Sequence, residues 1–267
     1  MSDLKITLIQ SNLHWENIDA NLRMFDEKIN SIQERTEIVV LPEMFSTGFS
    51  MQPEKLAQTM EGSAVNWMRK KAAEKKIVIT GSLIIEDRGY FFNRLIWMLP
   101  NGQFGTYDKR HLFGYAGEED HYHAGDKRLI AQVKGWKINL NICYDLRFPV
   151  WARNTIQPST QEPAYDALIY VANWPERRKT AWTTLLQARA IENQCFVVGV
   201  NRVGNDGNKI YHSGESSLID PMGEIVYRKS DDEDIFSYTL QRDKLNEVRS
   251  HLPFLKDADA FTILPRP

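Results

Sequence analysis

Short apolar runs alternate with amphipathic helical patterns along most of this 267-residue chain. Residues 4–9 predict a strand, and residues 18–32 then carry an apolar side chain every three or four positions, which predicts a helix with one buried face. By the same reasoning we expect further strands at residues 37–41, 77–85, 91–99, 104–107, 129–133, 136–142, 167–171, 196–200, 216–219, 224–227 and 234–240, and further helices at 63–75, 180–194 and 243–251. Residues 144–154 have helical spacing that Pro149 interrupts. So many strands with helices between them indicate an α/β fold in which two sheets pack together under covering helices.

No linker, low-complexity tract or break in composition divides the chain, which favours a single domain over residues 1–267. The tail from about residue 253 is rich in apolar side chains, namely Phe254, Leu255, Phe261, Ile263 and Leu264. Apolar groups of this size are seldom left together in water. We therefore expect the tail to dock on the body of the protein or on a partner subunit.

Charge and cysteine content exclude several classes of protein. The 33 basic and 35 acidic side chains leave a formal net charge of −2, which supplies no basic field for a nucleic acid. No apolar run reaches the roughly 18 to 20 residues that a membrane span requires, and the first residues carry no signal-peptide pattern. Two cysteines are too few for a disulfide scaffold. Together these features predict a cytoplasmic protein with no membrane or nucleic-acid partner.

The two cysteines stand in different local settings. Cys143 follows the predicted strand 136–142 and opens a helix-forming segment, so backbone amides at that junction could lower the thiol pKa and hold an oxyanion. The alternative for Cys143 is a buried core cysteine. Cys195 precedes an apolar strand, and core packing is the favoured interpretation there.

Two charged residues directly follow predicted strands. Glu43 comes after the apolar run 37–41, and Lys109 comes after the strand 104–107. Ligands of open α/β sheets gather at the carboxyl ends of strands, so both are candidate site residues. Each residue taken alone could equally be a solvated surface charge. None of the six histidines has a local signature that ties it to Cys143.

Residues 118–123 offer a rival site. This segment holds three carboxylates and two histidines, a composition that could bind a divalent metal. Glycines flank it on both sides, which indicates a loop, and a solvated loop is the favoured interpretation.

Three motifs in order carry a family resemblance: Leu41-Pro42-Glu43, then Asp108-Lys109-Arg110-His111-Leu112-Phe113, then Cys143-Tyr144-Asp145-Leu146-Arg147-Phe148-Pro149. Further matches at residues 170–175, 188–193 and 214–221 extend the likeness over nearly the whole chain. The chain resembles the nitrilase, or carbon–nitrogen hydrolase, superfamily. Residues 44–49 and 173–175 are most similar to its omega-amidase branch, whose members resemble 2-oxoglutaramate amidases.

The resemblance implies a four-layer α-β-β-α sandwich, usually paired across its outer helices into a homodimer, with a higher homo-oligomer as the alternative. It also implies a Glu-Lys-Cys site that uses no metal or organic cofactor. Glu43 would be the general base and Cys143 the nucleophile that forms a thioester. Lys109 and the backbone N–H of Tyr144 would stabilise the oxyanion. A second glutamate often lies seven residues before a glycine in the following loop, which points from Gly125 to Glu118, with Glu119 as the alternative.

Substrate binding is open at several positions. Arg147 could hold a substrate carboxylate in a bidentate contact, or it could form a structural ion pair. Phe45, Tyr144 and Trp174 could be pocket walls, or they could pack in the core.

The resulting functional hypothesis is an omega-amidase that hydrolyses 2-oxoglutaramate, or an analogue such as 2-oxosuccinamate, to the dicarboxylate and ammonia. The alternatives are an N-carbamoyl amidase or other small-amide hydrolase of the same superfamily and, in another class, a non-catalytic binding protein.

Overall fold

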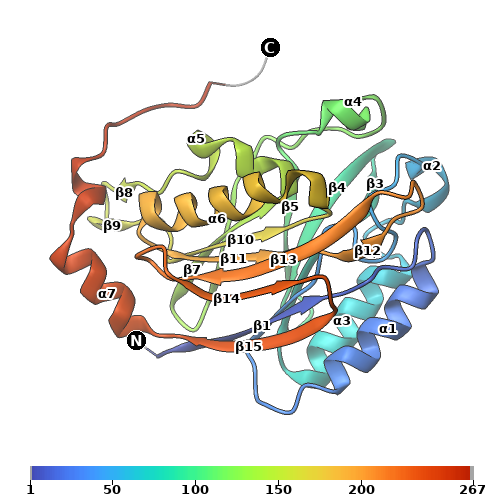
Figure 1. Cartoon of the computed structure of the whole chain (residues 1–267), viewed down its shortest axis with the longest axis horizontal. Helices are drawn as coiled ribbons and strands as arrows, with labels where there is room; N and C mark the ends of the chain where they lie inside the picture. The colour runs from blue at the N-terminus through green and yellow to red at the C-terminus, as the bar shows by residue number, and fades with distance from the viewer. Residues whose placement is uncertain (1, 265–267) are drawn as a thin grey trace.

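Two β-sheets lie face to face in the computed structural model, which describes residues 2–264 (Figure 1). The first sheet has the order β15 (Asp234–Leu240), β1 (Leu4–Gln10), β2 (Ile38–Val40), β3 (Val78–Asp87), β4 (Tyr90–Met98) and β5 (Phe104–Asp108). The second has the order β12 (Val203–Asn205), β13 (Tyr211–Ile219), β11 (Phe196–Val200), β10 (Ala167–Val171), β7 (Trp136–Ile142) and β6 (Leu129–Val133), with β14 (Ile225–Ser230) paired to β13. A small hairpin joins β8 (Ile156–Gln157) to β9 (Glu162–Pro163).

Helices cover the outer face of each sheet. The helices α1 (Ile18–Asn30) and α3 (Ser63–Lys75) pack on the first sheet, and α5 (Pro149–Ala152) and α6 (Lys179–Asn193) lie over the second (Figure 1). The remaining helices are α2 (Pro53–Leu56), α4 (Glu118–His121) and α7 (Arg242–His251), with short 3-10 turns η1 (Gly114–Ala116), η2 (Cys143–Arg147), η3 (Glu176–Arg178) and η4 (Phe254–Asp257). The predicted α-β-β-α order of layers is confirmed.

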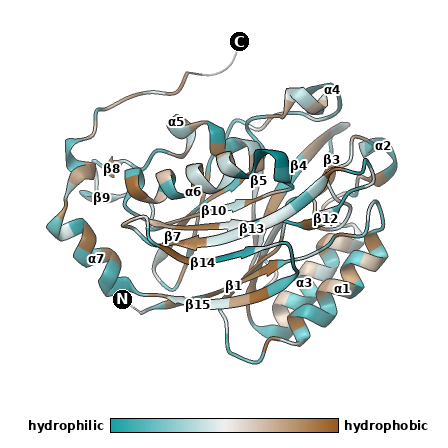
Figure 2. Ribbon diagram, in the orientation of Figure 1, coloured by the Kyte–Doolittle hydropathy of each residue, from teal (hydrophilic) through white to brown (hydrophobic). Residues whose placement is uncertain are grey.

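Alternating side chains on single strands supply two cores. Ile38 and Val40 of β2 join the cluster between the sheets, whereas Val39 joins the cluster under α1 and α3. This division follows from the two-residue period of a strand, which points neighbours to opposite faces. In Figure 2 the hydrophobic residues are visible along β1 and β7. A strand apolar on both faces is the pattern expected of a sheet covered on both sides.

Strand directions bring several chain segments to one edge of the molecule. The strands β1, β2 and β3 are parallel, and β7, β10 and β11 are parallel. Since β4 is antiparallel to both β3 and β5, β5 runs in the same direction as β3. The segments after β2, β5 and β7 carry Glu43, Lys109 and Cys143.

The helical spacing over residues 144–154 is interrupted at Pro149, as the sequence indicated, but the part before Pro149 is a 3-10 turn and not an α-helix. The segment forms the 3-10 turn η2 and then the short helix α5, with Phe148 in a non-helical conformation between them. Pro149 explains the break, because its ring disfavours the α conformation at the preceding residue, whereas its fixed φ suits the first position of a new helix.

The C-terminal tail is only partly buried in the described residues. Leu255 of η4 is buried, and Ile263 packs against the core cluster between the sheets. Phe254, Phe261 and Leu264 are exposed.

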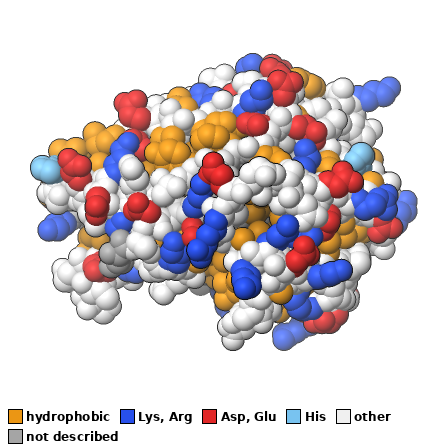
Figure 3. Space-filling model, turned by 90° about the horizontal axis from the view of Figure 1, so that it is seen from below, with side chains coloured by type: hydrophobic (Ala, Val, Ile, Leu, Met, Phe, Trp, Pro, Cys, Tyr) orange, Lys and Arg blue, Asp and Glu red, His pale blue; other side chains and the backbone are white. Residues whose placement is uncertain are grey.

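The surface of the described residues has no large region of one charge on the face that Figure 3 shows. In that view, from below, acidic and basic side chains are interspersed, as the near-zero net charge suggests. Within residues 2–264, no helix is both long and apolar enough to cross a membrane.

Candidate active site

A lysine lies between two carboxylates at the edge where the strands end. Lys109 Nζ donates to Glu43 Oε1 at 2.9 Å, and it also contacts both carboxylate oxygens of Glu118, at 3.0 and 2.8 Å. All three side chains are fully buried. Glu119 is exposed, so the structure brings Glu118 rather than its neighbour to Lys109.

Burial and mutual charge determine how this cluster titrates. Burial disfavours the Lys109 cation, but the negative charges of Glu118 and Glu43 outweigh it and raise the pKa of Lys109. Burial and the neighbouring Glu43 raise the pKa of Glu118, and the attraction of Lys109 opposes them. A buried ion pair is stable only when its remaining hydrogen-bonding capacity is also satisfied. Lys109 is therefore cationic at neutral pH.

Asn93 and Asn173 fix both the side chain and the backbone of Glu43. Asn93 Nδ2 of β4 donates to Glu43 Oε1 at 2.7 Å, and the backbone N–H of Asn173 donates to Glu43 Oε2 at 2.8 Å. Asn173 Nδ2 also donates to the backbone carbonyl of Glu43 at 2.5 Å. These contacts tie the loop after β2 to the loop after β10, which joins the two sheets at the site. The Glu43 side chain therefore has little freedom to rotate.

Cys143 occupies a sharp turn directly after β7. Its φ of 43° is in the left-handed region, which is costly for a residue other than glycine. The side chain is 9% exposed and lines a cavity. Burial, together with the charge of Glu43, raises the thiol pKa, although Lys109 acts in the opposite direction. The sequence predicted that backbone amides could lower the thiol pKa, and this direction is wrong because burial and the charge of Glu43 raise it.

Asp145 holds the cysteine turn against the lysine segment. Its Oδ2 accepts the backbone N–H of Ile142 at 3.0 Å and the hydroxyl of Tyr107 at 2.7 Å. Its Oδ1 accepts the backbone N–H of His111 at 3.0 Å and lies 2.8 Å from the ring Nδ1. Because Tyr107 and His111 flank Lys109 in the chain, this one buried carboxylate fixes the position of Lys109 relative to Cys143.

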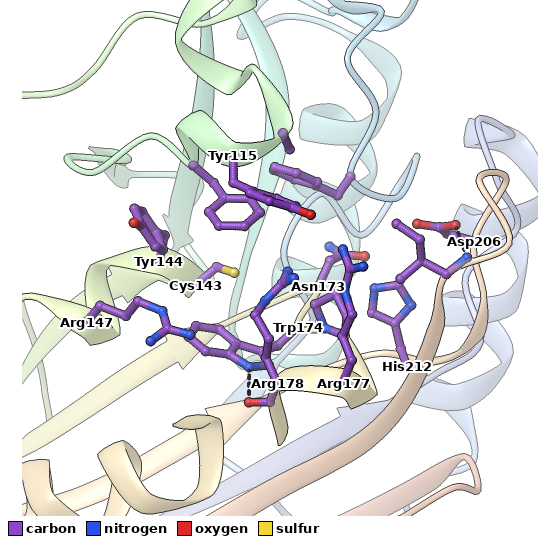
Figure 4. A pocket seen from close by; sticks show the side chains of 15 residues that line it. Tyr115, Cys143, Tyr144, Arg147, Asn173, Trp174, Arg177, Arg178, Asp206 and His212 are labelled. Atoms are coloured by element: carbon purple, nitrogen blue, oxygen red, sulfur yellow. Dashed lines mark hydrogen bonds between the residues drawn. The ribbon is translucent and has the colours of Figure 1, made fainter. Parts of the chain in front are cut away.

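A cavity of about 250 Å³ opens beside Cys143 (Figure 4). Tyr144 and Trp174 line it, as the sequence predicted, and so does Arg147. Phe45 does not line it. That ring is fully buried under α1 and α3, edge-on to Phe25 with 5.6 Å between the ring centroids, so the prediction of Phe45 as a pocket wall is wrong.

The surroundings of Arg147 do not include an ion pair. Its guanidinium carbon lies 4.9 Å from the ring centroid of Trp174, within the range of a cation–π contact. Among residues 2–264, no carboxylate lies within salt-bridge distance of it. The structural ion-pair alternative is therefore not met by the described residues, and this guanidinium keeps its hydrogen-bond donors for another partner.

The rival metal segment has a different arrangement from the one its composition suggests. Glu118 turns inward to Lys109, and the His123 ring packs 4.1 Å from the ring of Tyr90. Within the described part of the chain, no group of three or more histidine, cysteine or carboxylate side chains is arranged to hold a metal ion.

Several residues of the site escaped the sequence analysis. Asn93 was available as a signal because it is a polar residue inside an apolar strand, and Asp145 was available because it belongs to the motif that begins at Cys143, although no role was predicted for it. Arg177 and Arg178 of η3 also line the cavity. They lie in a charged stretch that reads as ordinary surface, and nothing in the sequence marks them.

Comparison with known proteins places this geometry in a family. The family described as carbon-nitrogen hydrolase matches residues 5–250. Omega-amidase YafV of Escherichia coli (strain K12) is 42% identical over 98% of this chain and 100% of the relative. A 2-oxoglutaramate amidase of Bacillus subtilis (strain 168) is 30% identical over 94% of this chain and 96% of the relative.

A solved structure has the same architecture. A carbon–nitrogen hydrolase superfamily protein of Xanthomonas campestris, solved with an arsenic adduct in its active site, superposes with a TM-score of 0.96. It is 40% identical, and the match covers 98% of this chain and 100% of that one.

Proposed function

The chain belongs to the carbon–nitrogen hydrolase family, and on that premise we propose how it acts on 2-oxoglutaramate. It is an omega-amidase, since its similarity to omega-amidases runs over nearly the whole of both chains. Such an enzyme hydrolyses the terminal amide of a dicarboxylate monoamide and releases ammonia. One observation carries the assignment of the site: a buried lysine and two buried carboxylates lie behind a cysteine that faces an arginine-lined cavity.

In the first step Cys143 is the nucleophile and Glu43 its general base. Because burial and the charge of Glu43 raise the pKa of Cys143, the resting thiol keeps its proton and needs a base when it attacks. Sγ bonds to the amide carbon while Glu43 takes the proton. Lys109 and the backbone N–H of Tyr144 stabilise the negative charge that develops on the amide oxygen.

The intermediate then collapses with loss of ammonia. The carbon–nitrogen bond breaks, Glu43 returns its proton to the leaving nitrogen, and a thioester remains on Cys143. Glu43 next takes a proton from water as the water oxygen attacks the thioester. The carbon–sulfur bond breaks, the thiolate regains the proton from Glu43, and the new carboxylic acid loses its proton to solvent as the dicarboxylate leaves. Glu118 keeps Lys109 charged and in place through both halves of the reaction.

Arg147 is the proposed partner of the substrate carboxylate, and Tyr144 and Trp174 are proposed walls. A guanidinium with free donors can bind a carboxylate through two parallel hydrogen bonds. The stack on Trp174 orients it without using those donors.

Steady-state kinetics on a panel of amides test the substrate. We expect kcat/KM to be highest for 2-oxoglutaramate, followed by 2-oxosuccinamate, and far lower for glutamine, asparagine and an N-carbamoyl amino acid. A preference for the carbamoyl compound would instead support the N-carbamoyl amidase alternative. Absence of turnover on every amide would refute the proposed reaction.

We also propose a single domain that forms homodimers in the cytoplasm. Residues from both halves of the chain share the cluster between the sheets, which supports one domain. Val150 of α5, Ile191 of α6 and Met222 are exposed apolar side chains on the outer helical side, which supports pairing there. A reducing compartment would keep Cys143 as a free thiol. Sedimentation equilibrium measures the molar mass in solution. A wild type at twice the chain mass and an Ile191→Glu variant at one chain mass would support the dimer, whereas a monomeric wild type would refute it.

A further inference from the structure

Three arginines converge on the cavity that contains Cys143. Arg147 comes from η2, and Arg177 and Arg178 come from η3 at the start of α6 (Figure 4). Within residues 2–264, none of these guanidinium groups forms a salt bridge or donates a side-chain hydrogen bond to the protein. Asp206, the carboxylate that lines the same cavity, accepts the backbone N–H groups of two residues in its own turn. The cavity therefore has an excess of positive charge with unused donors.

Of the two arginines in η3, Arg178 is held more firmly by its neighbours. Its backbone carbonyl accepts the indole N–H of Trp174 at 2.8 Å, and its backbone N–H donates to Pro175 at 3.0 Å. Its guanidinium carbon lies 4.9 Å from the ring centroid of Phe113. Arg177, in contrast, is exposed. Trp174 thus supports Arg147 with its ring face and the Arg178 backbone with its N–H.

The electrostatics of this arrangement favour an anion. Burial, together with the positive charges of Arg177 and Arg147, lowers the pKa of Arg178. The electrostatic interaction with Cys143 raises this pKa but does not outweigh them. Half-buried cations held near one another without a counter-ion are stabilised when a negative charge enters between them. A carboxylate with two acceptor oxygens suits a pair of guanidinium forks.

We propose that Arg178 is a specificity-determining residue that, together with Arg147, binds the carboxylate remote from the amide that Cys143 attacks. This inference rests on the proposed omega-amidase function and adds a selection rule to it. An amino-acid amide such as glutamine carries an α-ammonium beside its carboxylate, and the arginine cluster repels that charge. A 2-oxo group at the same carbon is uncharged. The cluster thereby selects 2-oxo acid amides over amino-acid amides and over uncharged amides.

The test compares charged and uncharged substrates within each variant. Arg178→Gln keeps most of the side-chain length and removes the charge. We expect its kcat/KM to fall about 10- to 100-fold for 2-oxoglutaramate and for glutaramate, which has the carboxylate but no oxo group. For pentanamide, a neutral amide of the same chain length, we expect a change of less than about twofold. A ratio of two substrates on one preparation is independent of the fraction of correctly folded enzyme.

Two further variants sharpen the test. The control variant Lys179→Gln removes a positive charge from the neighbouring residue, whose side chain is 51% exposed and pairs with Glu176 at 3.4 Å. In this variant the ratio of kcat/KM for 2-oxoglutaramate to kcat/KM for pentanamide should equal that of the wild type. Arg178→Lys restores the charge and should recover part of the ratio. Equal losses on charged and neutral amides in Arg178→Gln, or no loss on either, would overturn the inference while leaving omega-amidase activity intact. A wild type that cleaves pentanamide but not 2-oxoglutaramate would instead overturn the proposed function.

Discussion

Cys143 and Cys195 are both free, both buried, and both have a thiol pKa raised by burial, yet their surroundings differ. Cys195 lies between α6 and β11, is fully buried in the cluster between the sheets, and donates its backbone N–H to Ala190 at 3.3 Å. Cys143 occupies a strained turn, lines a cavity, and has Glu43 and Lys109 close enough to influence its titration. Access, a base and a cation therefore distinguish the two thiols, whereas burial and the direction of the pKa shift do not.

Removal of each sulfur gives the largest expected contrast. Cys143→Ala should lower kcat on 2-oxoglutaramate by about 10⁴-fold or more, because no other group can form the thioester. Cys195→Ala should keep most of the activity and lower the free energy of unfolding by about 1 to 2 kcal/mol, as a small core truncation does. Kinetics and urea unfolding of both variants measure this contrast. Equal losses of activity in the two variants would show that Cys143 contributes no more to catalysis than Cys195 does.

Loss of the base should rank next. Glu43→Gln keeps the side-chain shape but cannot accept the Cys143 proton, so kcat should fall about 10²- to 10⁴-fold. Circular dichroism and thermal unfolding establish whether the fold is retained. Near wild-type turnover in this variant would mean that another group deprotonates the thiol.

Loss of the cation should affect both activity and stability. Lys109→Met leaves Glu43 and Glu118 facing each other in a buried site, which should cost about 3 to 5 kcal/mol of unfolding free energy. The kcat of the folded fraction should fall about 10²- to 10³-fold, because one oxyanion donor is lost. The matched control is Lys134→Met, which removes an exposed lysine paired with Glu37 at 3.1 Å. A Lys109 variant as stable as this control would contradict the buried ion cluster.

A smaller effect is expected when Asp145, which supports the turn at Cys143, is substituted. Asp145→Asn cannot accept all the hydrogen bonds that the carboxylate receives from Ile142, Tyr107 and His111. Misplacement of Cys143 relative to Lys109 should lower kcat about 10- to 100-fold with little change in KM. A purely structural role would instead lower stability and leave the kcat of folded enzyme unchanged.

The smallest effect at neutral pH concerns a histidine in the wall of the cavity. Burial, with the nearby Arg202 cation, lowers the pKa of His212 to about 4. Since the unfolded histidine titrates near 6.5, the unfolded state binds more protons between those values. The stability that comes from keeping His212 neutral is present above about pH 6.5 and is lost as the pH falls to 4, a change of about 3 kcal/mol. Urea unfolding at pH 7 and pH 4 should show this slope in the wild type but not in His212→Asn, and parallel pH profiles would disprove it.

Periodicity and strand order predicted much of the fold and the centre of the site. Apolar runs marked strands such as β2 and β7, and the rule that ligands gather at the carboxyl ends of strands made Glu43 and Lys109 candidates. Cys143 became a candidate because it lies where a strand meets a helix-forming segment. The position of each relative to the others depends on strand pairing, which the motifs imply only through the family resemblance. Asn93 illustrates the limit: its contact with Glu43 requires β2 to pair in parallel with β3, and β3 to pair with β4. The parallel pairing of β2 with β3 is a long-range choice that no local pattern encodes.

The errors have identifiable physical causes. Phe45 packs in the core because Gly81 of β3 leaves room for its ring, and a Cβ at Gly81 would lie 2.9 Å from the Phe45 ring. The helix after Cys143 is replaced by a 3-10 turn because Pro149 interrupts the segment and Asp145 holds the turn. The role proposed for Arg178 depends on tertiary placement of η3 against Trp174 and Phe113, and an isolated arginine in a charged stretch gives no sign of it.

The difference between the two cysteines is tested most directly by peptide mass spectrometry of enzyme quenched in acid during turnover of 2-oxoglutaramate. The predicted result is a thioester adduct, with the mass of 2-oxoglutarate less one water, on the peptide that contains Cys143 and not on the peptide that contains Cys195. An adduct on Cys195, or full turnover in Cys143→Ala, would contradict the assignment of Cys143 as the nucleophile.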